Sequence, residues 1–207
     1  PGHRYRVADA AEALAACDYD VFVTSTNDYP ALTYLISTAD VVWMWRVPAG
    51  RRTKRILRAA RTAGAVVLGD IDDLVFLPEL VDSDKVDGLR TLKLETNKMV
   101  KAYKARGEML AATDLRVGTT ASLVRALTET VGSAVQLPNG YDDDGWRNSQ
   151  EGLANVRNDG VIRIGYAGGS LTHQKDLVVA APAVARVLRE NPDVRLVLFR
   201  GFVDHLE

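Results

Sequence analysis

Residues 161–176 of the chain read Val-Ile-Arg-Ile-Gly-Tyr-Ala-Gly-Gly-Ser-Leu-Thr-His-Gln-Lys-Asp. The apolar residues at its start predict a buried strand, the glycines that follow predict a turn without side chains, and an amphipathic helix is expected to begin near Thr172. A strand, a glycine turn and a helix N-terminus together form an anion site, because the N–H groups of the turn point outward and the helix dipole favours negative charge. This segment therefore predicts a ligand that carries a phosphate or diphosphate.

The rest of the chain alternates in the same way between short apolar runs and amphipathic segments. We expect strands over 20–25, 40–47, 65–69, 115–118, 134–137, 161–166 and 194–199. We expect helices over 7–16, 51–62, 121–131 and 172–189, a short helix ending near 37, and a long one within 83–113. Strands that alternate with helices at short spacing predict an α/β fold with a parallel, Rossmann-like sheet and right-handed crossovers.

A polar segment at 142–160 divides the chain. Asp, Asn, Gly and Arg dominate it, which is typical of a surface loop or an interdomain linker. We therefore expect an N-terminal Rossmann-like domain over 1–141 and the beginning of a second Rossmann-like domain over 161–207. Since the chain opens directly into a predicted helix and closes just after a predicted strand, we expect a fragment truncated at both ends whose first strand is missing.

Composition excludes several classes of partner. The 26 Lys and Arg residues nearly balance the 27 Asp and Glu residues, so a basic nucleic-acid-binding surface is not expected. No apolar run approaches the roughly twenty residues that cross a bilayer, which predicts no transmembrane segment.

The single cysteine, Cys17, forms no intramolecular disulfide and is expected to be a small buried residue, as in a cytoplasmic protein. The basic run at 51–55 predicts a solvated helix face, with peripheral contact to phospholipid headgroups as the alternative.

Three carboxylates, Asp70, Asp72 and Asp73, follow the strand predicted over 65–69, and we call them the acidic edge. Ligands of open α/β folds bind where the strands end. Crowded carboxylates usually persist where a cation, a substrate hydroxyl or a proton is handled. Asp72 and Asp73 are therefore candidate functional residues, and the alternative is that one of them caps the next turn.

The Asp-x-Asp of the acidic edge is similar to the first motif of haloacid-dehalogenase-like phosphatases. In that family the first Asp, here Asp70, is the nucleophile and the second, here Asp72, is a general acid, with magnesium between them. The resemblance implies a magnesium-dependent phosphatase, with a hydroxyl from Thr119 or Thr120 and a second acidic cluster at 142–144. Leu74 stands where the family has Thr or Val, so this class is an alternative enzyme assignment.

A larger set of features resembles the retaining glycosyltransferases of the GT-B fold, particularly family 4 (glycosyl transferase group 1). These features are the acidic edge, the strand and its flanks at 112–120, the Leu-Pro-Asn-Gly-Tyr-Asp turn at 137–142 and the glycine-rich segment at 161–176. The resemblance covers nearly the whole chain. It implies two Rossmann-like domains that face each other across a cleft. It also implies transfer of a sugar from a nucleotide-diphosphate donor to an acceptor hydroxyl, with retention of configuration and without a metal or other cofactor.

Within that resemblance, Gly168, Gly169 and Ser170 form the loop that contacts the donor diphosphate. Lys175 matches the family's phosphate-facing lysine at the next helix. Gly169 occupies the place of the arginine that usually accompanies this lysine, and His173 is expected to compensate by donating a hydrogen bond or a charge.

On the acceptor side, Asp72 and Asp73 fall where the family places a catalytic or acceptor-orienting residue. Tyr5-Arg6 resembles the start of the family's first helix, beside the acceptor loop, which implies that Arg6 binds the acceptor. The alternative for Arg6 is a salt bridge at a helix end. The family's Glu-x7-Glu segment belongs beyond residue 207, so a non-catalytic binding module that kept the fold is the second class of hypothesis. The expected partners are a nucleotide-diphosphate sugar and an acceptor that the sequence does not identify.

Overall fold

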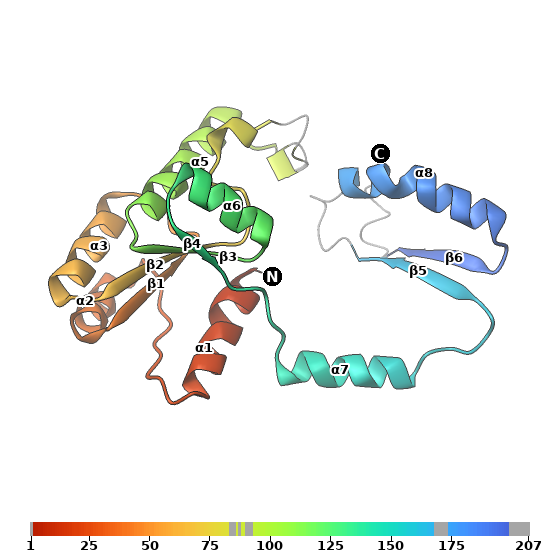
Figure 1. Cartoon of the computed structure of the whole chain (residues 1–207), viewed down its shortest axis with the longest axis horizontal. Helices are drawn as coiled ribbons and strands as arrows, with labels where there is room; N and C mark the ends of the chain where they lie inside the picture. The colour runs from red at the N-terminus through yellow and green to blue at the C-terminus, as the bar shows by residue number, and fades with distance from the viewer. Residues whose placement is uncertain (1, 83–85, 87, 90–92, 168–173, 199–207) are drawn as a thin grey trace. The chain divides into compact units, whose positions relative to one another are not determined.

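The computed structural model describes residues 2–82, 86, 88–89, 93–167 and 174–198 (Figure 1). The chain divides into two compact units. One is formed by Pro1–Leu80 and Val100–Ser149, and the other by Val81–Met99 and Gln150–Glu207. Both units contain parallel strands joined through helices, which confirms the predicted α/β class and is consistent with a Rossmann-like arrangement.

The first unit is built on a parallel sheet with the order β1-β2-β3-β4. Its strands are β1 (Val41–Trp45), β2 (Val66–Ile71), β3 (Leu115–Gly118) and β4 (Ala134–Gln136). Its helical elements are η1 (Arg4–Ala8, a π-helical turn), α1 (Asp9–Ala15), α2 (Tyr29–Thr38), α3 (Arg51–Ala63), η2 (Pro78–Leu80, a 3₁₀ turn), α5 (Thr96–Ala111, which begins in the second unit), α6 (Ala121–Thr130) and most of α7 (Asp143–Ala154). Helices α3, α5 and α6 cover one face of the sheet, and the N-terminal helix formed by η1 and α1 lies on the other face (Figure 1).

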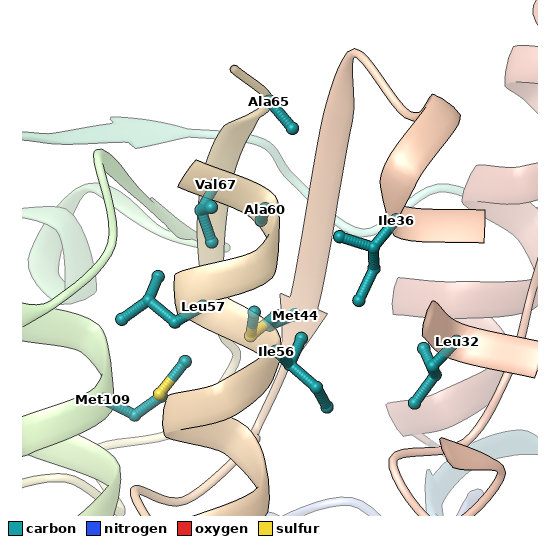
Figure 2. Packing of buried hydrophobic residues seen from close by; sticks show 9 residues of the cluster. All are labelled: Leu32, Ile36, Met44, Ile56, Leu57, Ala60, Ala65, Val67 and Met109. Carbon is teal, nitrogen blue, oxygen red and sulfur yellow. The ribbon is translucent and has the colours of Figure 1, made fainter. Parts of the chain in front are cut away.

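The core of the first unit lies between the sheet and the helices of its covered face. Figure 2 shows the larger cluster of buried residues, which joins α2, α3, β1 and β2 and takes one residue from α5. Its members are Leu32, Ile36, Met44, Ile56, Leu57, Ala60, Ala65, Val67 and Met109. A second cluster continues under α6 and contains Ile71, Phe76, Leu110, Leu123 and Leu127. Because strand residues alternate between faces, the residues of β1 and β2 that avoid this core point to the face of the N-terminal helix.

Local signals explain where two helices of this unit end and begin. Helix α3 stops at Gly64, whose φ of 79° is the left-handed conformation that glycine adopts at a helix end. Helix α6 begins after Thr120, whose hydroxyl accepts a hydrogen bond from the Leu123 N–H at 3.2 Å. These ends agree with the predicted helices over 51–62 and 121–131.

The described part of the second unit contains one strand-helix-strand connection. Strand β5 (Ile162–Tyr166) pairs in parallel with β6 (Val194–Leu198), and α8 (Gln174–Glu190) connects them. Ile164 lies opposite Leu196 in the register. The strand predicted over 161–166 is therefore present, and so, from residue 174 on, is the helix predicted over 172–189.

Two sequence predictions about local structure are wrong. Residues 20–25 form no strand, and Phe22 and Val23 are exposed. Aromatic and β-branched residues favour a strand only where a partner strand and a packed face exist, and this segment has neither. Cys17 is exposed and free, not buried.

The polar segment after β4 is also not a continuous loop, because α7 (Asp143–Ala154) occupies most of it. Asp142 caps this helix by accepting a hydrogen bond from the Gly145 N–H at 2.7 Å, and Asp143 and Asp144 in the first turn complement the helix dipole. No residue of α7 is buried, which explains why its composition resembles that of a linker.

Truncation of Leu127 tests the packing of the second core cluster. Leu127 is fully buried, and we expect Leu127→Ala to lower the free energy of unfolding by about 2–5 kcal/mol. Urea denaturation followed by tryptophan fluorescence measures this, since Trp43, Trp45 and Trp146 all belong to the first unit. The matched control is Leu80→Ala, an exposed leucine of the same unit, expected to change stability by about 0.5 kcal/mol or less. Equal losses in the two variants contradict the assignment of the core.

Candidate functional site

A buried ion pair organises the acidic edge. Asp70, near the end of β2, is fully buried, and Arg6 from η1 is nearly so. Arg6 Nη2 donates to Asp70 Oδ2 at 2.8 Å, and Arg6 Nε lies 3.2 Å from each oxygen of the same carboxylate. Arg6 Nη1 donates to the carbonyl of Leu137 at 2.7 Å. One guanidinium therefore ties the N-terminal helix to β2 and to the turn that follows β4.

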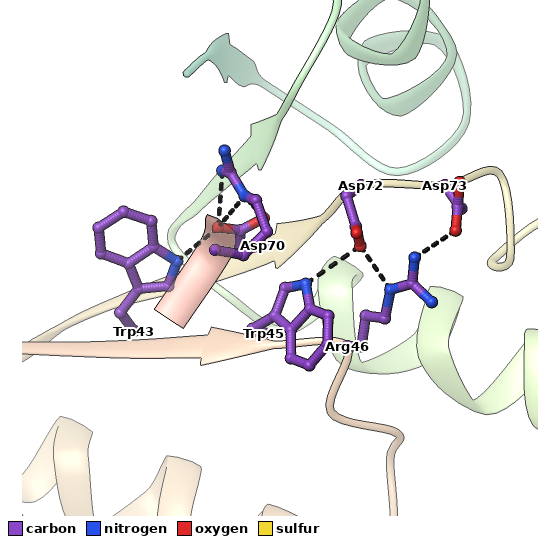
Figure 3. A network of polar contacts seen from close by, with 7 residues as sticks. Trp43, Trp45, Arg46, Asp70, Asp72 and Asp73 are labelled. Atoms are coloured by element: carbon purple, nitrogen blue, oxygen red, sulfur yellow. Dashed lines mark hydrogen bonds and ion pairs between the residues drawn. The ribbon is translucent and has the colours of Figure 1, made fainter. Parts of the chain in front are cut away.

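Two tryptophans of β1 donate to the same acidic edge (Figure 3). Trp43 Nε1 donates to Asp70 Oδ2 at 2.8 Å, and Trp45 Nε1 donates to Asp72 Oδ1 at 3.0 Å. In the parallel register Trp43 pairs with Leu68 and Trp45 with Asp70. Each indole thus reaches the carboxylate two residues beyond its register partner, which lies on the same face of the sheet.

Burial raises the pKa of Asp70 above its ordinary value of 3.8. The hydrogen bonds and charge of Arg6 and the hydrogen bond from Trp43 act in the opposite direction, while the charge of Asp72 adds to the rise. A carboxylate held this far from water needs these donors, because an unpaired charge at the same place is strongly unfavourable.

The outer two carboxylates are held by Arg46, the residue that follows β1. Figure 3 shows Arg46 Nε on Asp72 and Arg46 Nη2 on Asp73. The Arg46 N–H donates to the Asp70 carbonyl at 2.9 Å, and the Arg46 guanidinium carbon lies 5.3 Å from the Trp45 ring centroid. Arg46 has a φ of 51°, a left-handed conformation that is costly for a residue with a side chain and that this set of contacts maintains.

The two candidate catalytic residues differ in their access to solvent. The Asp72 side chain is 11% exposed, whereas the Asp73 side chain is 60% exposed. The start of the N-terminal helix shields Asp72, because a Cβ at Gly2 would lie 2.7 Å from Asp72 Oδ2. Of the two, Asp73 is the one whose side chain is mostly accessible to a ligand.

A small pocket lies beneath this edge. Arg46, Asp70, Arg106 and Thr113 are among the residues that line it, and its cavity volume is about 10 Å³. A pocket of this size holds about one water and no sugar ring.

Among the described residues, no group of three or more His, Cys, Asp or Glu side chains is placed to hold a metal ion. Within the same residues, no helix has both the length and the apolar composition needed to span a membrane.

The residues predicted for donor binding belong to the second unit. Gly168, Gly169, Ser170 and His173 lie outside the described residues. Lys175 is described, and it is the second residue of α8. Asp72, Asp73 and Arg6 therefore belong to the first unit, and Lys175 belongs to the second.

Arg6, predicted to bind the acceptor, is engaged by Asp70 and the Leu137 carbonyl, which matches the salt-bridge alternative. The sequence reasoning missed Trp43, Trp45 and Arg46 as partners of the acidic edge. Their only sequence signal is the Trp-x-Trp-Arg run at the end of a predicted strand. This run points to the acidic edge only once the pairing register of β1 with β2 is known.

Removing Arg6 tests the buried ion pair and its pH dependence. Arg6→Met removes contributions that lower the Asp70 pKa, so this pKa rises further above its ordinary value. We expect the free energy of unfolding to fall by about 3–5 kcal/mol near neutral pH. A carboxyl with a raised folded-state pKa favours folding below its unfolded-state pKa and loses this contribution as pH rises through the folded-state pKa. The deficit of the variant should therefore shrink in acid.

Urea denaturation over a pH series measures this deficit. Arg4→Met is the matched control, because the exposed Arg4 contacts Asp142 and Asp9 and should show a much smaller loss. A deficit for Arg6→Met that is independent of pH contradicts the pairing.

Comparison with known proteins adds no relative to this description. The chain matches no protein-family model, no curated protein and no solved structure.

Proposed function

We propose that the chain is part of a glycosyltransferase that moves a sugar from a nucleotide-diphosphate donor to an acceptor hydroxyl with retention of configuration. The observation that carries the proposal is the parallel β5-α8-β6 unit. Strand β5 ends at Tyr166, the glycine-rich segment follows, and α8 begins at Gln174 with Lys175 in its first turn. A glycine segment between a parallel strand and a helix N-terminus is a favourable place for a diphosphate.

Transfer of the sugar requires stabilisation of the leaving diphosphate. Negative charge grows on this group as the bond to the sugar breaks, and the N-terminal dipole of α8 and the ammonium of Lys175 oppose that charge. No step of this chemistry is assigned to a metal or another cofactor.

The acidic edge supplies the acceptor side of the proposal. Asp73 is the better candidate to orient an acceptor hydroxyl or to stabilise positive charge on the sugar ring, because most of its carboxylate is exposed. Asp72 is shielded and accepts from Trp45 and Arg46, so its contribution is to hold Arg46 and thereby position Asp73.

The phosphatase alternative is less favourable on geometric grounds. Its nucleophile would be Asp70, and a nucleophile must reach the phosphorus of its substrate. Asp70 is fully buried and is occupied by Arg6 and Trp43. The non-catalytic module is the other alternative, and donor binding separates it from the enzyme.

Donor binding is tested by calorimetric titration with UDP-sugars and GDP-sugars. We expect micromolar binding by the intact protein, and Lys175→Met should weaken it by about tenfold or more, the loss of one charge-assisted hydrogen bond. Arg189→Met, in the last turn of the same helix, is the matched control and should bind as the unchanged protein does. The absence of binding by the intact protein, or equal binding by Lys175→Met, contradicts the proposed donor site.

Sugar transfer by the full-length protein tests the acidic edge. Asp73→Asn removes the exposed carboxylate while keeping its shape, and we expect kcat to fall by about a hundredfold. Asp72→Asn should lower kcat less, because Asp72 acts through Arg46. Turnover that is unchanged in both variants removes the assignment of the acidic edge to catalysis.

A further inference from the structure

Arg106 on α5 has hydrogen-bond donors that no group in the described chain satisfies. Its Nε and Nη1 are buried and make no hydrogen bond. Its guanidinium carbon lies 5.8 Å from the Tyr103 ring centroid. Buried donors of a charged group are almost always paired in folded proteins, so these two call for an acceptor.

A second arginine borders the same place. Arg46 and Arg106 both line the small pocket beneath the ends of β1 and β2. Burial lowers the pKa of Arg106, and the charge of Arg46 lowers it further. An anion in the pocket would oppose both of these effects on the charge of Arg106.

The carboxylates of the acidic edge leave Arg106 without a counter-charge. Asp70 forms an ion pair with Arg6, and Asp72 and Asp73 form ion pairs with Arg46. No ion pair of Arg106 occurs among the described residues. A water molecule in the pocket would accept from Nε and Nη1 but would leave the charge of Arg106 uncompensated, which an anionic oxygen would not.

The size of the pocket limits what enters it. Space for about one water-sized atom admits a single oxygen of a larger group, with the remainder of that group outside. Phosphate and carboxylate groups present such an oxygen, and the planar guanidinium fork is suited to both.

We propose that Arg106 and Arg46 form a binding site for an oxyanion, a phosphate or carboxylate group, at the ends of β1 and β2. All of its residues belong to the first unit, so it does not depend on the donor site of the second. The exposed carboxylate of Asp73 competes for Arg46, and the arriving anion displaces it.

Titration of the intact protein with inorganic phosphate, and separately with acetate, tests this site. Ionic strength is held constant with sodium chloride. Melting curves give the thermal midpoint of unfolding, and NMR follows the arginine Nε–H signals. We expect one or both anions to raise the midpoint and to shift the Arg106 Nε–H signal, and the tighter binder identifies phosphate or carboxylate as the ligand class. No response to either anion means that the pocket holds only water, and the proposal fails.

Variants of the two arginines and of Asp73 sharpen the test. Arg106→Met breaks no ion pair and should fold, while Arg106→Lys keeps the charge without the planar fork; both should weaken the anion response by about tenfold or more. Lys104→Met, an exposed residue on the same helix, should respond as the unchanged protein does. Asp73→Asn should strengthen binding because it frees Arg46 Nη2. A response that persists in Arg106→Met, or that weakens in Asp73→Asn, overturns the proposal.

Discussion

The buried contact between Arg6 and Asp70 is the constraint on which the first unit depends. Taking a carboxylate out of water at the end of a strand is costly, and the cost is offset only if donors surround it. Arg6 supplies most of these donors and also binds the Leu137 carbonyl, so the N-terminal helix, β2 and the turn after β4 are fixed together. The helix also contacts the unit through Arg4, which pairs with Asp142, and through His3, whose ring packs edge-on against Trp45. The Arg6–Asp70 pair is its buried charged contact.

The same contact sets a gradient of exposure along the acidic edge. Asp70 is enclosed, Asp72 is covered by the start of the helix near Gly2, and Asp73 faces solvent. Three neighbouring carboxylates therefore have different roles, since only the outermost can meet a ligand directly. Arg46 links the outer two and also reaches the pocket that it shares with Arg106.

The sequence predicted the parts of the fold that local patterns determine. The strands at 41–45 and 66–71 and the end of α3 at Gly64 follow from apolar runs and from a glycine at a helix end. The prediction of a strand over 20–25 was wrong because a strand needs a neighbouring strand to pair with, and the sequence pattern does not show whether one is present. Helix α7 was missed because its residues are polar and none is buried, as in a loop, and because Asp142 was not recognised as its cap.

For the candidate site, the position of Asp72 and Asp73 after a strand was readable, but their partners were not. Trp45 and Arg46 reach them through the parallel register of β1 and β2, which no local pattern encodes. The burial of Asp70 depends on Arg6, more than sixty residues earlier in the chain. Contacts of this kind are decided by how elements pack, and they also decide which carboxylate can act.

Hydrogen exchange at the three tryptophan indoles tests the central claim most directly. Trp43 Nε1–H donates to the buried Asp70 carboxylate, whereas Trp146 lies half exposed on α7 and stacks on Tyr141. If Asp70 is enclosed by Arg6 and Trp43, the Trp43 indole proton exchanges far more slowly than that of Trp146. Exchange at similar rates would show that Asp70 is open to water, and it would contradict the account.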